Sequence, residues 1–131
     1  METTSATHSL WLDTAPPVDL PALVGDLQVD VAVLGGGIAG LTTALLLKRQ
    51  GARVAVVEAA GVGRGVTGCT TAKVTALQAT VYSQIRRRHG PGAAGTYAEA
   101  SLAGVERLAA LAAELAPDAE PERRPAFTYA A

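Results

Sequence analysis

Cysteine and long hydrophobic runs are the scarcest features of this 131-residue sequence. Cys69 is its one cysteine, which excludes a disulfide within the chain and a cysteine-based metal site. No apolar run reaches the roughly 18 residues that a membrane-spanning helix needs. Residues 1–5 do not begin a secretory signal, because no basic segment leads into an apolar core. These absences favour a reducing, cytoplasmic setting and no metal.

Charge and aromatic side chains are also sparse. Lys and Arg number 11 against 12 Asp and Glu, so no broad nucleic-acid-binding field is expected. The basic run at residues 86–89 has no interleaved aromatics and is interpreted as a solvated helix end rather than a nucleic-acid or membrane contact. Hydrophobic residues make up 49% of the chain and are mostly Ala, Val and Leu, which is typical of a globular α/β or helical domain.

The most informative stretch runs from residue 29 to residue 58. An apolar run at 31–34 is followed by three glycines at 35–37, and a helix is predicted from Ile38 to Gln50. Gly51 is the expected helix stop, and a second apolar run at 54–57 ends on Glu58. This order of strand, glycine turn, helix and strand predicts one βαβ unit.

The glycine spacing in this unit is typical of a site that binds a phosphate-containing ligand. Gly35-x-Gly37-x-x-Gly40 places glycine at a sharp turn, at a close approach to a ligand and at a tight helix–strand contact. The amides of Gly37, Ile38 and Ala39 open the helix, and with the helix dipole they form an anion site suited to a pyrophosphate.

Glu58 lies 21 residues after Gly37, at the predicted carboxyl end of the second strand. A carboxylate there can accept hydrogen bonds from both hydroxyls of an adenosine ribose but would repel a 2′-phosphate. No arginine follows in Ala59-Ala60, which disfavours an NADP site. A glycine turn in a parallel sheet that binds no ligand is the alternative.

Beyond Glu58, residues 59–75 are a predicted loop rich in glycine and hydroxyl side chains. It follows the second strand and therefore emerges on the ligand side of the sheet. Its glycines allow close backbone approach, and its hydroxyls suit phosphate or ribitol oxygens. A flexible surface loop is the alternative interpretation.

The rest of the sequence predicts an arm and helices. Residues 1–28 are an extended, proline-containing arm in which Trp11 is a structural anchor rather than a substrate-stacking group. A helix over about 78–89 breaks at residues 89–92, a long helix follows over about 93–116, and 125–129 read as the start of a strand. We therefore expect an incomplete Rossmann-like α/β domain: an arm (1–28), a cofactor-binding βαβ unit and loop (29–76), and a helical segment leading into an antiparallel strand of a truncated substrate domain (77–131).

Three segments together resemble a known family: Gly35–Gly40, Glu58, and the stretch Gly63-x-Gly65-x-Thr67-x-x-Thr70-Thr71-Ala72-Lys73. The chain is similar to the FAD-dependent oxidoreductases of the D-amino-acid oxidase (DAO) superfamily, in particular the glycine/D-amino-acid and γ-glutamylputrescine oxidase-like branch. Residues 11–13 and 123–129 also resemble that branch. The resemblance covers nearly the whole chain but only the N-terminal part of such a protein.

The resemblance implies that FAD is bound in extended form and that an amine or amino-acid substrate loses hydride from a C–N bond to the flavin. It implies a pyrophosphate on Gly35–Ala39, a ribose on Glu58 and a loop from Arg64 to Ala72 running toward the flavin ring. The implied cofactor-binding residues are Gly35, Gly37, Ile38, Ala39, Gly40, Glu58, Ala59, Arg64, Thr67, Thr70, Thr71 and Ala72.

Several alternatives stay open at this stage. The unit could be a nicotinamide-binding Rossmann module, or the chain could be a truncated product without catalytic activity. In some relatives a histidine near the position of Cys69 is linked to the flavin, so Cys69 could be linked likewise, although a small partly buried thiol is the simpler interpretation. Other relatives end in a Rieske iron–sulfur module, which this chain cannot hold. The catalytic residues are expected beyond residue 131.

Overall fold

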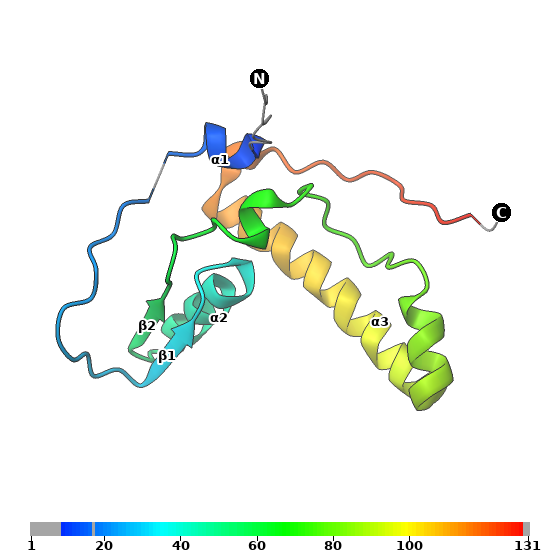
Figure 1. Cartoon of the computed structure of the whole chain (residues 1–131). Helices are drawn as coiled ribbons and strands as arrows, with labels where there is room; N and C mark the ends of the chain where they lie inside the picture. Colours follow the sequence, from blue (N-terminus) through cyan, green and yellow to red (C-terminus); the bar gives the residue numbers. More distant parts are fainter. Residues whose placement is uncertain (1–8, 17, 130–131) are drawn as a thin grey trace, which may run out of the picture. The chain divides into compact units, whose positions relative to one another are not determined.

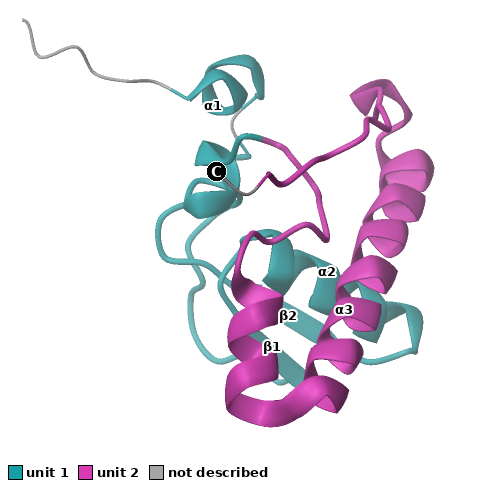
Figure 2. Ribbon diagram, turned by 90° about the vertical axis from the view of Figure 1, so that its right-hand side faces the viewer, with its two compact units in different colours: residues 1–71 teal, residues 72–131 magenta. Residues whose placement is uncertain are grey.

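The computed structural model describes residues 9–16 and 18–129 (Figure 1). The chain divides into two compact units, residues 1–71 and residues 72–131, coloured teal and magenta in Figure 2. The functions expected of segments 1–28, 29–76 and 77–131 stay predictions, because compactness alone does not test them.

The first unit is organised around a small parallel sheet. Strand β1 spans Val31–Leu34 and strand β2 spans Val54–Val57, which are the two predicted apolar runs. They pair in parallel, with Val31 opposite Val54 and Leu34 opposite Val57. The expected mixture of helix with a parallel sheet is confirmed at this level.

An ion pair fixes where the two strands begin. The Arg53 guanidinium lies 2.8 Å from Asp30 Oδ1, and the Arg53 backbone amide donates to Asp30 Oδ2 at 2.8 Å. These bonds from Arg53 lower the pKa of the Asp30 carboxyl below its ordinary value of 3.8. The strands therefore enter the sheet in one register, so that their carboxyl ends lie level with each other.

Helix α2 spans Ile38–Arg49 and covers one face of this sheet, as predicted to within a residue. The chain leaves β1 through Gly35 at φ +105° and leaves the helix through Gly51 at φ +90°, both left-handed conformations that favour glycine. A Cβ on Gly40 would lie 2.0 Å from the Gly35 carbonyl oxygen. The glycines predicted for the turn and for the tight helix–strand contact are thus confirmed in those roles.

The N-terminal arm is not wholly extended as predicted. Its described part begins with a short helix, α1, over Leu10–Thr14, and residues 18–30 form neither helix nor strand. The Trp11 indole N–H donates to the Thr70 carbonyl at 2.7 Å, which confirms Trp11 as an anchor. Thr70 follows a second short element, the 3-10 helix η1 over Val66–Cys69, inside the predicted loop.

The second unit contains helix α3, which spans Val81–Leu115 with a break at Gly90 (φ 84°, ψ 170°) followed by Pro91. The predicted interruption between two helices is confirmed. The Tyr82 and Tyr97 rings, one from each side of the break, meet edge to face with centroids 5.8 Å apart. No helix within 9–16 and 18–129 has the length and apolar character needed to cross a membrane.

The strand predicted over residues 125–129 is wrong. After the 3-10 helix η2 (Pro117–Ala119), the chain is extended and exposed through residue 129 without pairing to any described strand. Arg123 reaches back to Glu106 of α3 with N–O distances of 2.6 and 2.9 Å. An aromatic-rich segment becomes a strand only where a neighbouring backbone takes its hydrogen bonds, and none of the described residues does so.

Candidate functional site

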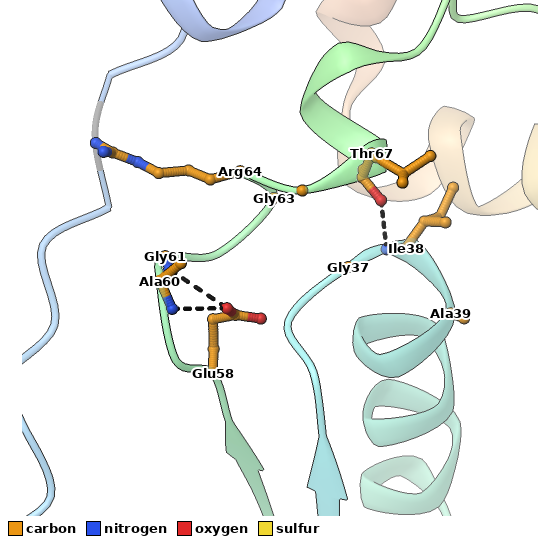
Figure 3. Close-up of a pocket in the computed structure, with 11 residues that line it drawn as sticks. Gly37, Ile38, Ala39, Glu58, Ala60, Gly61, Gly63, Arg64 and Thr67 are labelled. Carbon is orange, nitrogen blue, oxygen red and sulfur yellow. Dashed lines mark hydrogen bonds between the residues drawn. The ribbon is translucent and has the colours of Figure 1, made fainter.

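The amino end of α2 and the carboxyl end of β2 open onto one cavity of about 380 Å³ (Figure 3). The glycine turn after β1 and the loop after β2 line it, so two segments separated in the sequence meet there. Its lining residues are Gly37, Ile38, Ala39, Glu58, Ala60, Gly61, Gly63, Arg64, Gly65, Val66 and Thr67. The cavity holds backbone amides at a helix amino end together with one carboxylate.

Glu58 lies directly after β2 and turns its carboxylate toward backbone amides (Figure 3). Oε1 accepts from the amides of Ala60 at 2.9 Å and Gly61 at 3.4 Å, and Oε2 accepts from the Gly36 amide at 2.6 Å. The Ala60 amide first, then those of Gly36 and Gly61, lower the pKa of Glu58 below its ordinary value of 4.5. The group is therefore a carboxylate at neutral pH.

These contacts limit what else Glu58 can bind. A carboxylate offers about four acceptor positions on its two oxygens. The amides of Gly36, Ala60 and Gly61 occupy most of them, and the Ala59 amide also lowers the pKa of this carboxyl. The assignment of Glu58 to the two ribose hydroxyls stays a prediction.

Thr67 supplies the first turn of α2 with a hydrogen-bond partner from across the chain. Its Oγ1 accepts from the Ile38 amide at 3.0 Å (Figure 3), and Gly37, which precedes the helix, has no side chain to do so. A hydroxyl that accepts one hydrogen bond keeps its own proton for donation. Thr67 therefore occupies the Ile38 amide, which the sequence prediction assigned to a pyrophosphate. In its place the Thr67 hydroxyl can donate its proton to an anion in the cavity.

Glycines that the sequence prediction did not assign as site residues also shape the cavity. Gly36 is buried against Glu58, and a Cβ on it would lie 3.2 Å from the Glu58 side chain. Gly63 donates its amide to the Gly36 carbonyl at 3.0 Å, which ties the loop to the glycine turn. The signal for them was the glycine-rich composition of the turn and the loop, which does not show the partner of each glycine.

The predicted residues divide by position. Gly37, Ile38, Ala39, Glu58, Arg64 and Thr67 line the cavity, whereas Gly35 and Gly40 set the turn and the helix packing behind it. Ala59 lines a second hollow of about 840 Å³ between the arm and β2. Thr70 and Thr71 line neither hollow, and Ala72 belongs to the other compact unit. Their assignment to a cofactor stays a prediction.

Arg64 contributes its stem rather than its charge to the cavity wall. Figure 3 shows its side chain extending away from the α2 amino end. The Arg64 Cδ atom lies 2.7 Å from where a Cβ on Gly61 would stand, so the stem covers that glycine closely. Among the described residues, no group of three or more His, Cys, Asp or Glu side chains gathers to hold a metal.

Comparison with known families decides the class of protein. The sequence profile of the DAO family, described as FAD dependent oxidoreductase, matches residues 30–131. The chain belongs to this family. Its members are flavin-dependent oxidoreductases, and the cavity residues at the α2 amino end and Glu58 suit the phosphate and ribose of such a cofactor.

Individual relatives agree with the family assignment. The putative Rieske 2Fe-2S iron-sulfur protein YhfW of Bacillus subtilis is 36% identical over 126 residues, which are 96% of this chain and 25% of the relative. Aklavinone 12-hydroxylase RdmE of Streptomyces purpurascens is 57% identical over 35 residues, and DnrF of Streptomyces peucetius is 67% identical over 31. These two matches cover 27% and 24% of this chain and 6% of each hydroxylase.

The chain thus spans about a quarter of the length of YhfW and a small part of each hydroxylase. No solved structure matches the chain.

Proposed function

We propose that this chain forms the adenosine- and pyrophosphate-binding part of a Rossmann-like FAD site in an oxidoreductase that acts on C–N bonds of amines or amino acids. One observation carries the proposal: α2 amides, the Glu58 carboxylate and a glycine loop surround a single cavity. The bound flavin would accept the hydride removed from the substrate.

The binding roles follow from the geometry of the cavity. Thr67, which accepts from the Ile38 amide, offers its own hydroxyl proton to the pyrophosphate, next to the positive end of the α2 dipole. Glu58 offers its carboxylate to the hydroxyls of the adenosine ribose. The loop glycines keep side chains away, so backbone can approach the cofactor closely.

A nicotinamide dinucleotide is the second candidate, because the same turn and carboxylate bind NAD in other folds. The match of the FAD dependent oxidoreductase family over residues 30–131 favours FAD. The Cys69 thiol is exposed, so the expectation of a partly buried thiol is wrong. A reducing cytoplasmic setting is part of the proposal. A role in nucleic-acid binding is not proposed.

The test uses the full-length protein and two cofactors. We expect purified protein to be yellow, and its cofactor-free form to bind FAD but not NADH in fluorescence titrations. Colourless protein that ignores FAD and binds NADH would replace the first proposal with the second.

Glu58→Gln tests the site itself. We expect FAD affinity to fall on the order of tenfold, since an amide cannot replace a charged acceptor in these hydrogen bonds. Glu106→Gln is the matched control, because Glu106 is also an ion-paired carboxylate but lies in α3. Equal FAD affinity of Glu58→Gln and Glu106→Gln would refute the ribose role.

A further inference from the structure

The short helix α1 is attached to η1 by three neighbouring residues. The Ser9 hydroxyl donates to the Gly68 carbonyl, and the Trp11 indole donates to the Thr70 carbonyl at 2.7 Å. Leu12 packs on Gly68, where a Cβ would lie only 2.6 Å from Leu12 Cδ2. We call these contacts of Ser9, Trp11 and Leu12 with Gly68 and Thr70 the α1–η1 contact.

The α1–η1 contact adds to the loop contacts that surround Gly68 in η1. Gly68 is buried, and a Cβ on it would also lie 2.4 Å from the Gly63 carbonyl oxygen. Gly63 is in turn bonded to the glycine turn through Gly36. Gly68 is therefore enclosed between Leu12 and the loop, and η1 has little freedom to shift while α1 stays in place.

One residue before Gly68 is Thr67, whose hydroxyl accepts from the Ile38 amide at 3.0 Å. Hydrogen bonds of this kind weaken steeply when distance or angle departs from the preferred range. A displacement of η1 by a fraction of its own width would separate Thr67 from Ile38. The position of the hydroxyl at the α2 amino end therefore depends on what holds η1.

We propose that Ser9 and Trp11 are positioning residues for the phosphate end of the flavin site. Through the α1–η1 contact they hold Thr67 where it accepts from Ile38 and keeps its own proton for a phosphate oxygen. This assigns the N-terminal helix a role in cofactor binding without any contact to the cofactor. The proposal rests on the proposed function, because it specifies how the same site is organised.

The first test measures FAD binding by the full-length protein. Trp11→Phe keeps a ring but removes the N–H, and Ser9→Ala removes the hydroxyl; each should weaken FAD binding about fivefold. Ser9→Thr keeps a hydroxyl at this position and should bind FAD with the affinity of wild type. Thr14→Ala is the control, because the Thr14 hydroxyl donates at 2.8 Å to Leu10 within α1 and does not touch η1.

A double-mutant cycle tests the route. In a Thr67→Val background, the group that the α1–η1 contact positions is absent, so Trp11→Phe should have no further effect on FAD affinity. If Trp11→Phe weakens FAD binding equally in the Thr67→Val background, the proposal is overturned, because Trp11 would then not act through Thr67.

A second readout needs no flavin. In cofactor-free protein, hydrogen exchange at the Ile38 amide should be faster in Trp11→Phe than in wild type and unchanged in Thr14→Ala. The Gly36 amide, which donates to Glu58, is the internal reference and should keep its protection. Unchanged Ile38 exchange in Trp11→Phe overturns the positioning role, whereas wild-type protein that does not bind FAD overturns the proposed function alone.

Discussion

Glu58 links loop closure to ligand recognition through a single side chain. Its carboxylate closes the turn after β2 by accepting from Ala60 and Gly61, and it joins that turn to the β1 side through Gly36. A neutral side chain at this position would leave these amides without a charged acceptor. The residue therefore supports the shape of the cavity and also presents a carboxylate to it.

This double role predicts a pH dependence of stability. The pKa of Glu58 is lowered in the folded protein, so its contribution is fully present above its unfolded value of 4.5 and is lost as the pH falls through the folded pKa. We expect wild type to be more stable than Glu58→Gln at pH 7, and the difference to shrink below pH 4.5. Urea unfolding of both proteins at full length across this range measures it, and a difference independent of pH would contradict the prediction.

Gly40 gives a second prediction for a single residue. In Gly40→Ala the new Cβ would lie 2.0 Å from the Gly35 carbonyl oxygen, so α2 must move away from β1. We expect a loss of at least about 1–3 kcal/mol in the free energy of unfolding, the usual cost of overpacking.

The matched control for Gly40→Ala is Gly104→Ala in α3, where nothing lies within 4 Å of the new Cβ. There the better helix propensity of alanine should stabilise the protein by about 0.5–1 kcal/mol. Both free energies come from denaturant unfolding of the full-length protein. Equal effects of the two substitutions would mean that the helix–strand contact at Gly40 is looser than the structure shows.

Residue roles that depend on local backbone were predictable, and those that depend on distant partners were not. Gly35, Gly40 and Glu58 follow from where a strand ends and a helix begins. The bond between Thr67 and Ile38 joins positions 29 apart and depends on the fold of a loop whose sequence only suggests flexibility. The Thr67 hydroxyl lies 3.2 Å from where a Cβ on Gly37 would be. The glycine spacing predicted that only a ligand would approach Gly37 this closely.

Among the secondary-structure elements, those with a clear apolar pattern and glycine boundaries were the predictable ones. Helix α2 and the two strands have periodic or continuous apolar patterns and clear glycine boundaries. The short helix α1 has five residues, too few to be stable by itself, and depends on its contact with η1. The strand expected over residues 125–129 does not form. A strand needs a neighbouring strand for its hydrogen bonds, and the sequence of residues 125–129 does not show whether one is present.

The break in α3 carries a prediction at the scale of elements. Gly90 adopts φ 84° and ψ 170°, a region that is essentially open only to glycine. Gly90→Ala should therefore cost about 1–3 kcal/mol of stability through backbone strain. It should also disturb the contact of Tyr82 with Tyr97, which lies across the break.

Gly95→Ala, beyond the break, is the control for Gly90→Ala. Gly95 lies within the regular part of α3 with open space around it, so alanine should stabilise by about 0.5–1 kcal/mol. The free energy of unfolding of each full-length variant measures the change in stability. Near-ultraviolet circular dichroism of the tyrosines measures the change in the contact of Tyr82 with Tyr97. A Gly90→Ala protein as stable as Gly95→Ala would show that the break is not held in the conformation described.

For the whole molecule, the apolar surface is larger than a stable monomer would leave open. α2 covers one face of the two-stranded sheet, while Leu34 of β1 is 82% exposed. Val24 and Val66 are about 90% exposed, and Leu111 is the one hydrophobic residue in the described part of the chain with core-like burial. Two paired strands with an apolar face open to water are at best marginally stable.

The 131-residue polypeptide expressed alone should therefore self-associate or unfold without a cooperative transition. Exposed apolar surface and unpaired strand edges favour association with other chains. Light scattering, binding of a hydrophobic dye and a thermal melt measure this, with the full-length protein as the comparison. Changing Leu34→Lys on the open sheet face should reduce association of the short chain, because a charge there opposes apolar contact. A monodisperse monomer with a sharp melt would mean that these described side chains find cover within the 131 residues.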